Sequence, residues 1–179
     1  MRSFAIFFGL VLALSMVGCK SKSPAGERVR TPFSGSKYES NNRFFRAVGQ
    51  ASSGRENIAR SRAEIDAKGR LASQVETNIR RVADDYIAET QNANASDIAE
   101  KFQSLTREVM DTELQDIRMI GEEKFYNGEQ FTVYVALEIR KSAMFRFMRQ
   151  RARTDARIDK MTLKAIEDIL DAEIKKADD

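Results

Sequence analysis

The single cysteine of the chain, Cys19, is the residue whose type and setting point most directly to chemistry. It follows a charged start at Met1 and Arg2, an apolar stretch over residues 4–17, and the small residue Gly18. This order is typical of a lipoprotein signal peptide. We therefore expect the Cys19 thiol to be lipidated, the chain to be cleaved between Gly18 and Cys19, and the new amino terminus to be acylated.

The apolar stretch before Cys19 is too short for a stable membrane-spanning helix, which needs about 20 apolar residues. Residues 1–18 are accordingly expected to be a lipoprotein signal peptide. Met16 stands three residues before the cysteine, where leucine is usual, so an ordinary signal peptide with an incidental cysteine stays open. Lys20 follows the cysteine, and this favours a lipid-anchored protein on the periplasmic side of the outer membrane.

The rest of the composition offers little to catalysis. The chain has no histidine, so the commonest general base and the commonest neutral metal ligand are both missing. Neither a glycine-rich phosphate loop nor a Gly-x-Ser-x-Gly elbow occurs. We expect no enzyme, no catalytic residue, no metal and no cofactor. The formal net charge of +3 falls by one with the loss of Arg2, to +2, and this argues against nucleic-acid binding.

A basic segment over residues 140–160 is the strongest charge feature, with methionine and phenylalanine side chains between the arginines. Its arginines Arg146, Arg149, Arg153 and Arg157 are candidates for a surface that contacts an acidic partner, another subunit or anionic lipid. A solvated helix face whose aromatic residues cover the sheet is the alternative.

The segment after the cysteine is polar and contains both prolines of the chain, Pro24 and Pro32. Residues 19–42 are therefore predicted to form the lipidated cysteine and a flexible tether. A folded α+β domain over 43–140 and an amphipathic basic helix over 141–179 are predicted to follow.

Within that domain, residues 43–51 are β-prone, and residues 55–91 carry apolar side chains at helical spacing. The first half of this helix is rich in alanine, so we expect it to make the closest contact with the sheet. A second helix is expected from Ser96, which is suited to capping it.

Two strand-like runs, 114–126 and 129–139, flank Asn127-Gly128, a pair typical of a tight hairpin turn. The charged residues Glu122 and Glu123 precede the turn and are interpreted as a charge cluster at the end of a strand. These elements predict an α+β fold: a small antiparallel sheet, made of the N-terminal strand and the hairpin, packed on the long helix, with an extra C-terminal helix.

Three sequence runs carry a family resemblance: AVGQA at 47–51, ARSRAEIDAKGRLA at 59–72 and YVAL at 134–137. Together they resemble the roughly twenty-kilodalton outer-membrane lipoproteins of bacteria, whose relatives include flagellar outer-membrane assembly lipoproteins. The resemblance implies a compact α+β domain, frequent oligomeric assembly and no catalytic residues. It also implies a topology similar to that of dodecins, whose flavin stacks on tryptophan, a residue that this chain lacks.

Two functions are consistent with these observations. The first is a non-enzymatic structural or assembly component of the cell envelope, anchored to the membrane by its N-terminal lipid. It would form a homo-oligomer or bind an envelope-assembly protein. The alternative is a lipoprotein that binds a small ligand or a lipid between its sheet and helices.

Overall fold

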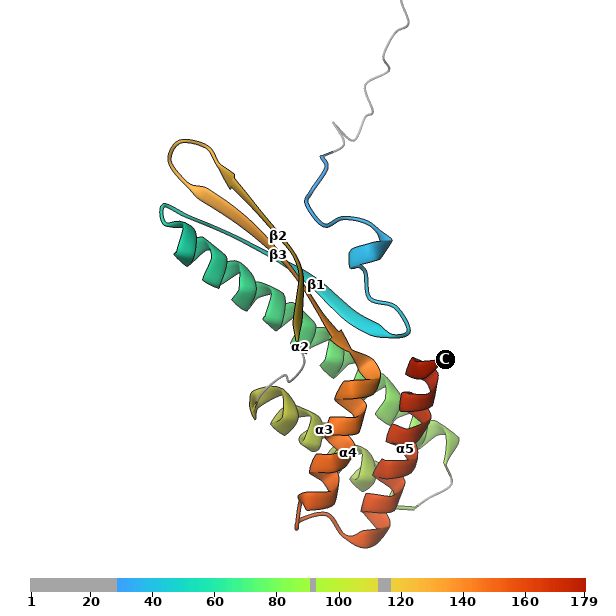
Figure 1. The fold of residues 1–179 in the computed structure, drawn as a ribbon. Helices are drawn as coiled ribbons and strands as arrows, with labels where there is room; N and C mark the ends of the chain where they lie inside the picture. The colour runs from blue at the N-terminus through green and yellow to red at the C-terminus, as the bar shows by residue number, and fades with distance from the viewer. Residues whose placement is uncertain (1–28, 91–92, 113–116) are drawn as a thin grey trace, which may run out of the picture. The chain divides into compact units, whose positions relative to one another are not determined.

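The computed structural model describes residues 29–90, 93–112 and 117–179 (Figure 1). The chain divides into two units, the first ending at Arg30 and the second comprising Thr31–Asp179. The elements of the second unit are η1 (Ser36–Tyr38), β1 (Phe44–Ser53), α2 (Glu56–Glu89), α3 (Ala95–Thr112), β2 (Arg118–Tyr126), β3 (Phe131–Arg140), α4 (Lys141–Thr154) and α5 (Lys160–Asp178).

The three strands form one antiparallel sheet in the order β1-β3-β2, so that β3 is central. The predicted fold class, a small antiparallel sheet packed on a long helix, is therefore confirmed. The predicted hairpin is also present, but its connection is longer than a two-residue turn. The Asn127 side chain accepts hydrogen bonds from the main-chain N–H groups of Glu129 (3.0 Å) and Gln130 (2.8 Å), and Gly128 adopts a φ of 98°.

The first half of α2 lies very close to β1, as its alanine-rich pattern predicts. Ala59, Ala63 and Ala67 are completely buried against the sheet. Gly49 of β1 lies beneath them, and a Cβ atom at this position would be 2.1 Å from the Ala63 carbonyl oxygen and 2.4 Å from the Ala67 nitrogen. A side chain at residue 49 is therefore incompatible with this approach.

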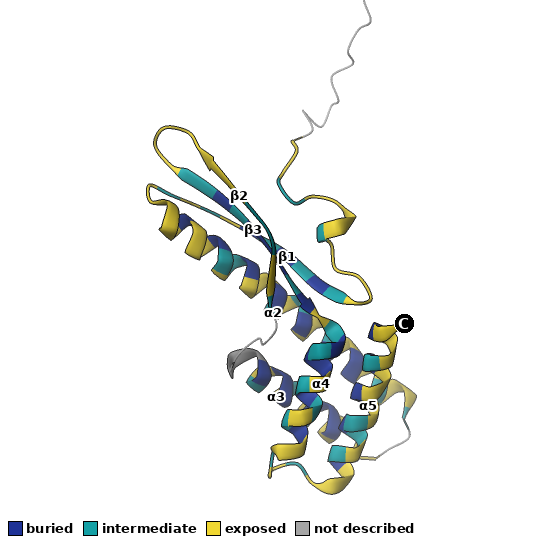
Figure 2. Ribbon diagram, in the orientation of Figure 1, coloured by how far each residue is buried: buried dark blue, intermediate teal, exposed yellow. Residues whose placement is uncertain are grey.

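The second half of α2 buries larger side chains, among them Leu71, Val75 and Ile79. It packs against α3, and α4 packs along α5. The buried residues of the sheet and of these helices form one continuous hydrophobic core (Figure 2).

The C-terminal segment differs from the prediction, because two helices replace the single helix expected over 141–179. Asp159 starts the second one, its Oδ1 accepting hydrogen bonds at 3.0 Å from the main-chain N–H groups of both Met161 and Thr162. This N-cap begins α5 after the break that follows Thr154, and α5 then folds back along α4.

Part of the predicted tether over 19–42 belongs to the folded unit, and residues 19–28 lie outside the described residues. Residues 31–43, which we call the strap, belong to the second unit and contain η1. The prediction rested on the polar residues and prolines of this segment and did not consider its aromatic residues Phe33 and Tyr38, whose ring centroids are 4.9 Å apart.

The strap crosses the face of the sheet that points away from α2. On β2, the Phe33 ring lies so close to Gly121 that a Cβ atom there would be 2.5 Å from it. Gly121 pairs with Ala136 of β3. Side chains alternate between the two faces of a strand, so Ala136 points away from α2, and it is nevertheless buried. At the other side of the sheet, Ser40 of the strap bonds the main chain of Arg46 on β1.

Candidate functional site

The residues predicted for lipidation and cleavage, Cys19 and Gly18, lie outside the described residues, so both assignments stay predictions. Within the part of the chain that the structure describes, no helix is long and apolar enough to cross a membrane.

The four arginines predicted to form a basic surface all take part in ion pairs within the chain. The pairs are Arg146 with Asp178, Arg149 with Asp171, Arg153 with Glu167, and Arg157 with both Asp155 and Glu108. Their positive charge is therefore matched by acidic groups of α3, of α5 and of the connection between α4 and α5. Contact of this surface with a partner or with lipid stays a prediction.

The connection between α4 and α5 is held by two carboxylates. Hydrogen bonds from the side chain and the main chain of Arg157 lower the pKa of Asp155 to about 2. Hydrogen bonds from Thr162, and a weaker one from Lys101 of α3, hold the pKa of Asp159 well below its usual value. These charged groups accordingly serve the packing of the three helices.

The free edge of β1 is closed by side chains. Ser40 Oγ accepts a hydrogen bond from the main-chain N–H of Arg46 at 2.8 Å, and Gln74 Nε2 donates to the Arg46 carbonyl at 3.0 Å. Further along, Asp66 Oδ2 accepts from the main-chain N–H of Gln50 at 3.1 Å. Because these groups occupy the sites that another strand would use, β1 is a guarded edge.

The free edge of β2 is open by comparison. Its one strand neighbour among the described residues is β3, and over residues 119–126 these residues place no other main-chain partner along it. The strand exposes three large side chains: Met119 is 40% exposed, Phe125 51% and Tyr126 60% (Figure 2). We call the outer side of residues 119–126 the β2 edge, and we take it as the candidate interaction site.

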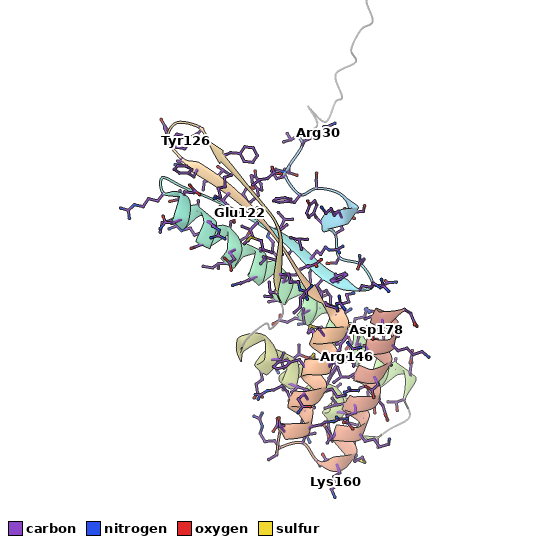
Figure 3. The ribbon with its side chains drawn as sticks, in the orientation of Figure 1. Arg30, Glu122, Tyr126, Arg146, Lys160 and Asp178 are labelled. Atoms are coloured by element: carbon purple, nitrogen blue, oxygen red, sulfur yellow. The ribbon has the colours of Figure 1, made fainter. Side chains whose placement is uncertain are left out.

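Aromatic contacts hold the exposed end of this strand in place. Phe125 makes an edge-to-face contact with Tyr134 of β3, with ring centroids 5.9 Å apart. The ring of Tyr126, at the end of the hairpin in Figure 3, has its centroid 4.6 Å from that of the Phe131 ring. The β2 edge therefore presents ordered aromatic side chains, which are enriched in protein interfaces.

Four charged residues tie β2 to the first turns of α2. Lys124 Nζ lies 2.6 Å from Glu56 and 3.1 Å from Glu122, and Arg60 Nε lies 2.7 Å from Glu122. Partial burial raises the pKa of the Glu122 carboxyl, but the hydrogen bonds from Arg60 and Lys124 outweigh this effect and lower it overall. The charge cluster predicted at the end of the strand is thus an alternating set of charges that joins β2 to α2.

A groove of about 660 Å³ runs between the strap, β1 and α2. Tyr38, Val48 and Arg70 are among its lining residues. It is open to solvent and offers both an aromatic ring and guanidinium groups.

Sequence reasoning found the strands but did not find which strand would be at the edge. The signal was present in the composition of the two runs: β2 carries four charged residues, whereas β3 alternates apolar side chains almost without interruption. Charged residues are common on edge strands, where they discourage unwanted pairing.

The described residues contain no group of three or more His, Cys, Asp or Glu side chains arranged to hold a metal ion. Comparison with protein-family models, with curated proteins and with solved structures finds no match to this chain.

Proposed function

We propose that this chain is a lipid-anchored, non-enzymatic structural protein of the cell envelope that acts through protein–protein contact and self-associates. Its expected location is the periplasmic side of the outer membrane. The proposal joins two observations: the lipoprotein-type signal that ends at Cys19, and the open β2 edge with its exposed aromatic side chains.

The β2 edge is the observation that carries this proposal. Long exposed strands with apolar side chains are liabilities unless another chain covers them. The same sheet closes its β1 edge with hydrogen bonds from Ser40, Gln74 and Asp66 to the main chain, and over residues 119–126 of β2 the described part of the chain shows no such bonds.

The anchor is tested with the Cys19→Ser variant of the full-length chain, produced in bacteria that are fed an alkyne-labelled fatty acid. The parent chain is expected to carry the label and to sediment with membranes, and the variant is expected to lose the label. A parent chain without label would contradict the lipid anchor.

Self-association is tested by analytical ultracentrifugation of the full-length chain in a density-matched detergent. We expect a concentration-dependent species larger than the monomer. A chain that stays monomeric across a hundredfold concentration range, and that captures no envelope protein after crosslinking in cells, would contradict the structural role.

Ligand binding is the second candidate, and the groove beside β1 is the observation that favours it. Native mass spectrometry of the chain purified from envelope extracts tests this candidate. A co-purified small molecule that is lost in the Tyr38→Ala variant would support a ligand site there, and a clean protein mass would count against it.

A further inference from the structure

We infer that the occupant of the β2 edge is the β2 edge of a second copy of this chain, paired antiparallel about Glu123. Two three-stranded sheets would then form one sheet of six strands. This inference rests on the proposed function, because it specifies how the self-association takes place.

Charge complementarity selects this register. When two β2 strands pair antiparallel with Glu123 on the twofold axis, Lys124 of each copy lies opposite Glu122 of the other. A register centred on Glu122 brings two Glu122 side chains together, and one centred on Lys124 brings two Lys124 side chains together. The pairing about Glu123 places opposite charges face to face twice. A pairing about Ile120 would also set Arg118 opposite Glu122, but it would be centred on the irregularity between Met119 and Gly121.

The other face of the strand supports the same register. Phe125 of each copy would lie opposite Gly121 of the other, and Gly121 is already covered by the Phe33 ring of its own strap. The half-exposed Phe125 ring would thus gain an apolar neighbour in the second copy. The irregularity in β2 lies between Met119 and Gly121, at the end of the paired segment, where it leaves the central residues regular.

The positions of the straps also suit two copies of one anchored chain. The twofold axis of an antiparallel edge pair is perpendicular to the sheet, so the corresponding faces of both copies point the same way. Each strap begins beside β2, where Phe33 lies on Gly121, and crosses the face that points away from α2. Both straps therefore lie on the same face of the six-stranded sheet, an arrangement that suits two copies anchored in one membrane.

One feature of this register opposes association. The two Glu123 carboxylates would lie side by side on the axis, and like charges directly opposite each other destabilise a pair of strands. Removal of this charge is therefore expected to strengthen the dimer, which is the reverse of what most substitutions in an interface do.

The register is tested by oxidative crosslinking of full-length chains in the membranes of the cells that produce them. Residues directly opposite each other have Cα atoms about 4.5–5.5 Å apart, within the range that a disulfide bridges. Glu123→Cys is expected to form disulfide dimers at least about tenfold faster than the parent chain, whose only cysteine is Cys19.

Two further cysteine variants show whether disulfide crosslinking is specific to residue 123. Gln50→Cys places a thiol on the guarded β1 edge, and Phe125→Cys places one on β2 away from the axis. Both are expected to crosslink no faster than the parent. If either matches Glu123→Cys, or if Glu123→Cys matches the parent, the inference is wrong.

Charge variants provide a second, independent measurement. Glu123→Gln is expected to lower the dissociation constant of the dimer. Lys124→Glu is expected to raise this constant about tenfold or more, because the new carboxylate would lie opposite Glu122 of the other copy. Lys68→Glu makes the same change of charge on α2, where Lys68 pairs with Glu64 of its own helix, and is expected to leave the constant unchanged. Equal effects of Lys68→Glu and Lys124→Glu would overturn the register.

The outcomes separate this inference from the function on which it rests. A chain that self-associates but shows no preferential crosslinking at residue 123 keeps the structural role and refutes the β2 pairing. A chain that is monomeric in ultracentrifugation and uncrosslinked at every position refutes both.

Discussion

The two edges of the sheet are built by opposite means. β1 is pressed against α2 through Gly49, and side chains from the strap and from α2 occupy its outward main-chain groups. β2 is joined to α2 by charged side chains, and over residues 119–126 its outward main chain has no partner beyond β3 among the described residues. The sheet therefore has one edge that is packed and hydrogen-bonded by its own chain and one that the described residues leave open.

This difference follows from the place of α2 on the sheet. The long helix makes its sheet contacts mainly with β1 and the central β3, so the inward side of β2 is met by long polar side chains instead of alanine. Close packing needs small residues, whereas lysine, arginine and glutamate can span a wider gap. The two edges thus differ because α2 packs closely on β1 and β3 but not on β2.

The largest effect is expected at Gly49, which makes the close packing at β1 possible. Gly49→Ala places a Cβ atom against the main chain of α2 and is expected to destabilise the fold by about 3 kcal/mol. Urea unfolding of the full-length chain measures this loss.

Gly69→Ala is the matched control for that change. Gly69 is on α2 with no atom near its missing side chain, so alanine there is expected to stabilise the chain by about 0.5–1 kcal/mol. Equal effects of the two substitutions would show that β1 and α2 are not in close contact.

A smaller effect is expected from opening the guarded edge. Asp66→Ala removes the acceptor for the Gln50 N–H group and is expected to cost about 1–2 kcal/mol. It should also increase the crosslinking of a Gln50→Cys chain, because the β1 edge then resembles the β2 edge.

Glu64→Ala is the matched control for Asp66→Ala, since the ion pair of Glu64 among the described residues is with Lys68 of its own helix. It is expected to change stability by less than about 0.5 kcal/mol and to leave crosslinking at residue 50 unchanged. Increased crosslinking in both variants would mean that Asp66 does not guard the edge.

The smallest expected effect concerns the charges that join β2 to α2. The pKa of Glu122 is lowered in the folded chain, so its stabilising contribution is complete above the usual carboxyl pKa of about 4.3 and is lost as the pH falls through the lower folded value. Hydrogen exchange of β2 is expected to speed up relative to β1 over that acidic range.

Glu122→Gln tests the origin of this pH dependence, because glutamine keeps the shape of the side chain and does not titrate. The variant is expected to show a smaller difference between β2 and β1 as the pH falls. An unchanged pH dependence would assign the effect to other carboxylates.

Local patterns predicted the elements of the fold well. The alternation in residues 131–139, the pair Asn127-Gly128 and the alanine positions Ala59, Ala63 and Ala67 each carry a period or a turn signal that the structure confirms. The break between α4 and α5 was missed because no glycine or proline marks it. Its signal is the capping pair Asp159 and Thr162.

The candidate site was less predictable, because it depends on distant contacts. The acidic partners of Arg146 and Arg153 lie on another helix, at positions 178 and 167, and no local pattern connects them. Likewise, Ser40 and Asp66 guard β1 only because the strap and α2 meet at that strand. The lipidation of Cys19, which local sequence predicts most directly, still awaits its experiment.

The most direct test of the difference between the two edges is hydrogen–deuterium exchange of the full-length chain, measured by mass spectrometry at low and at high protein concentration. Peptides covering β2 are expected to gain protection at high concentration, while those covering β1 are expected to be equally protected at both concentrations. Protection gained at β1 instead of β2, or at neither strand in a chain that self-associates, would contradict this expectation.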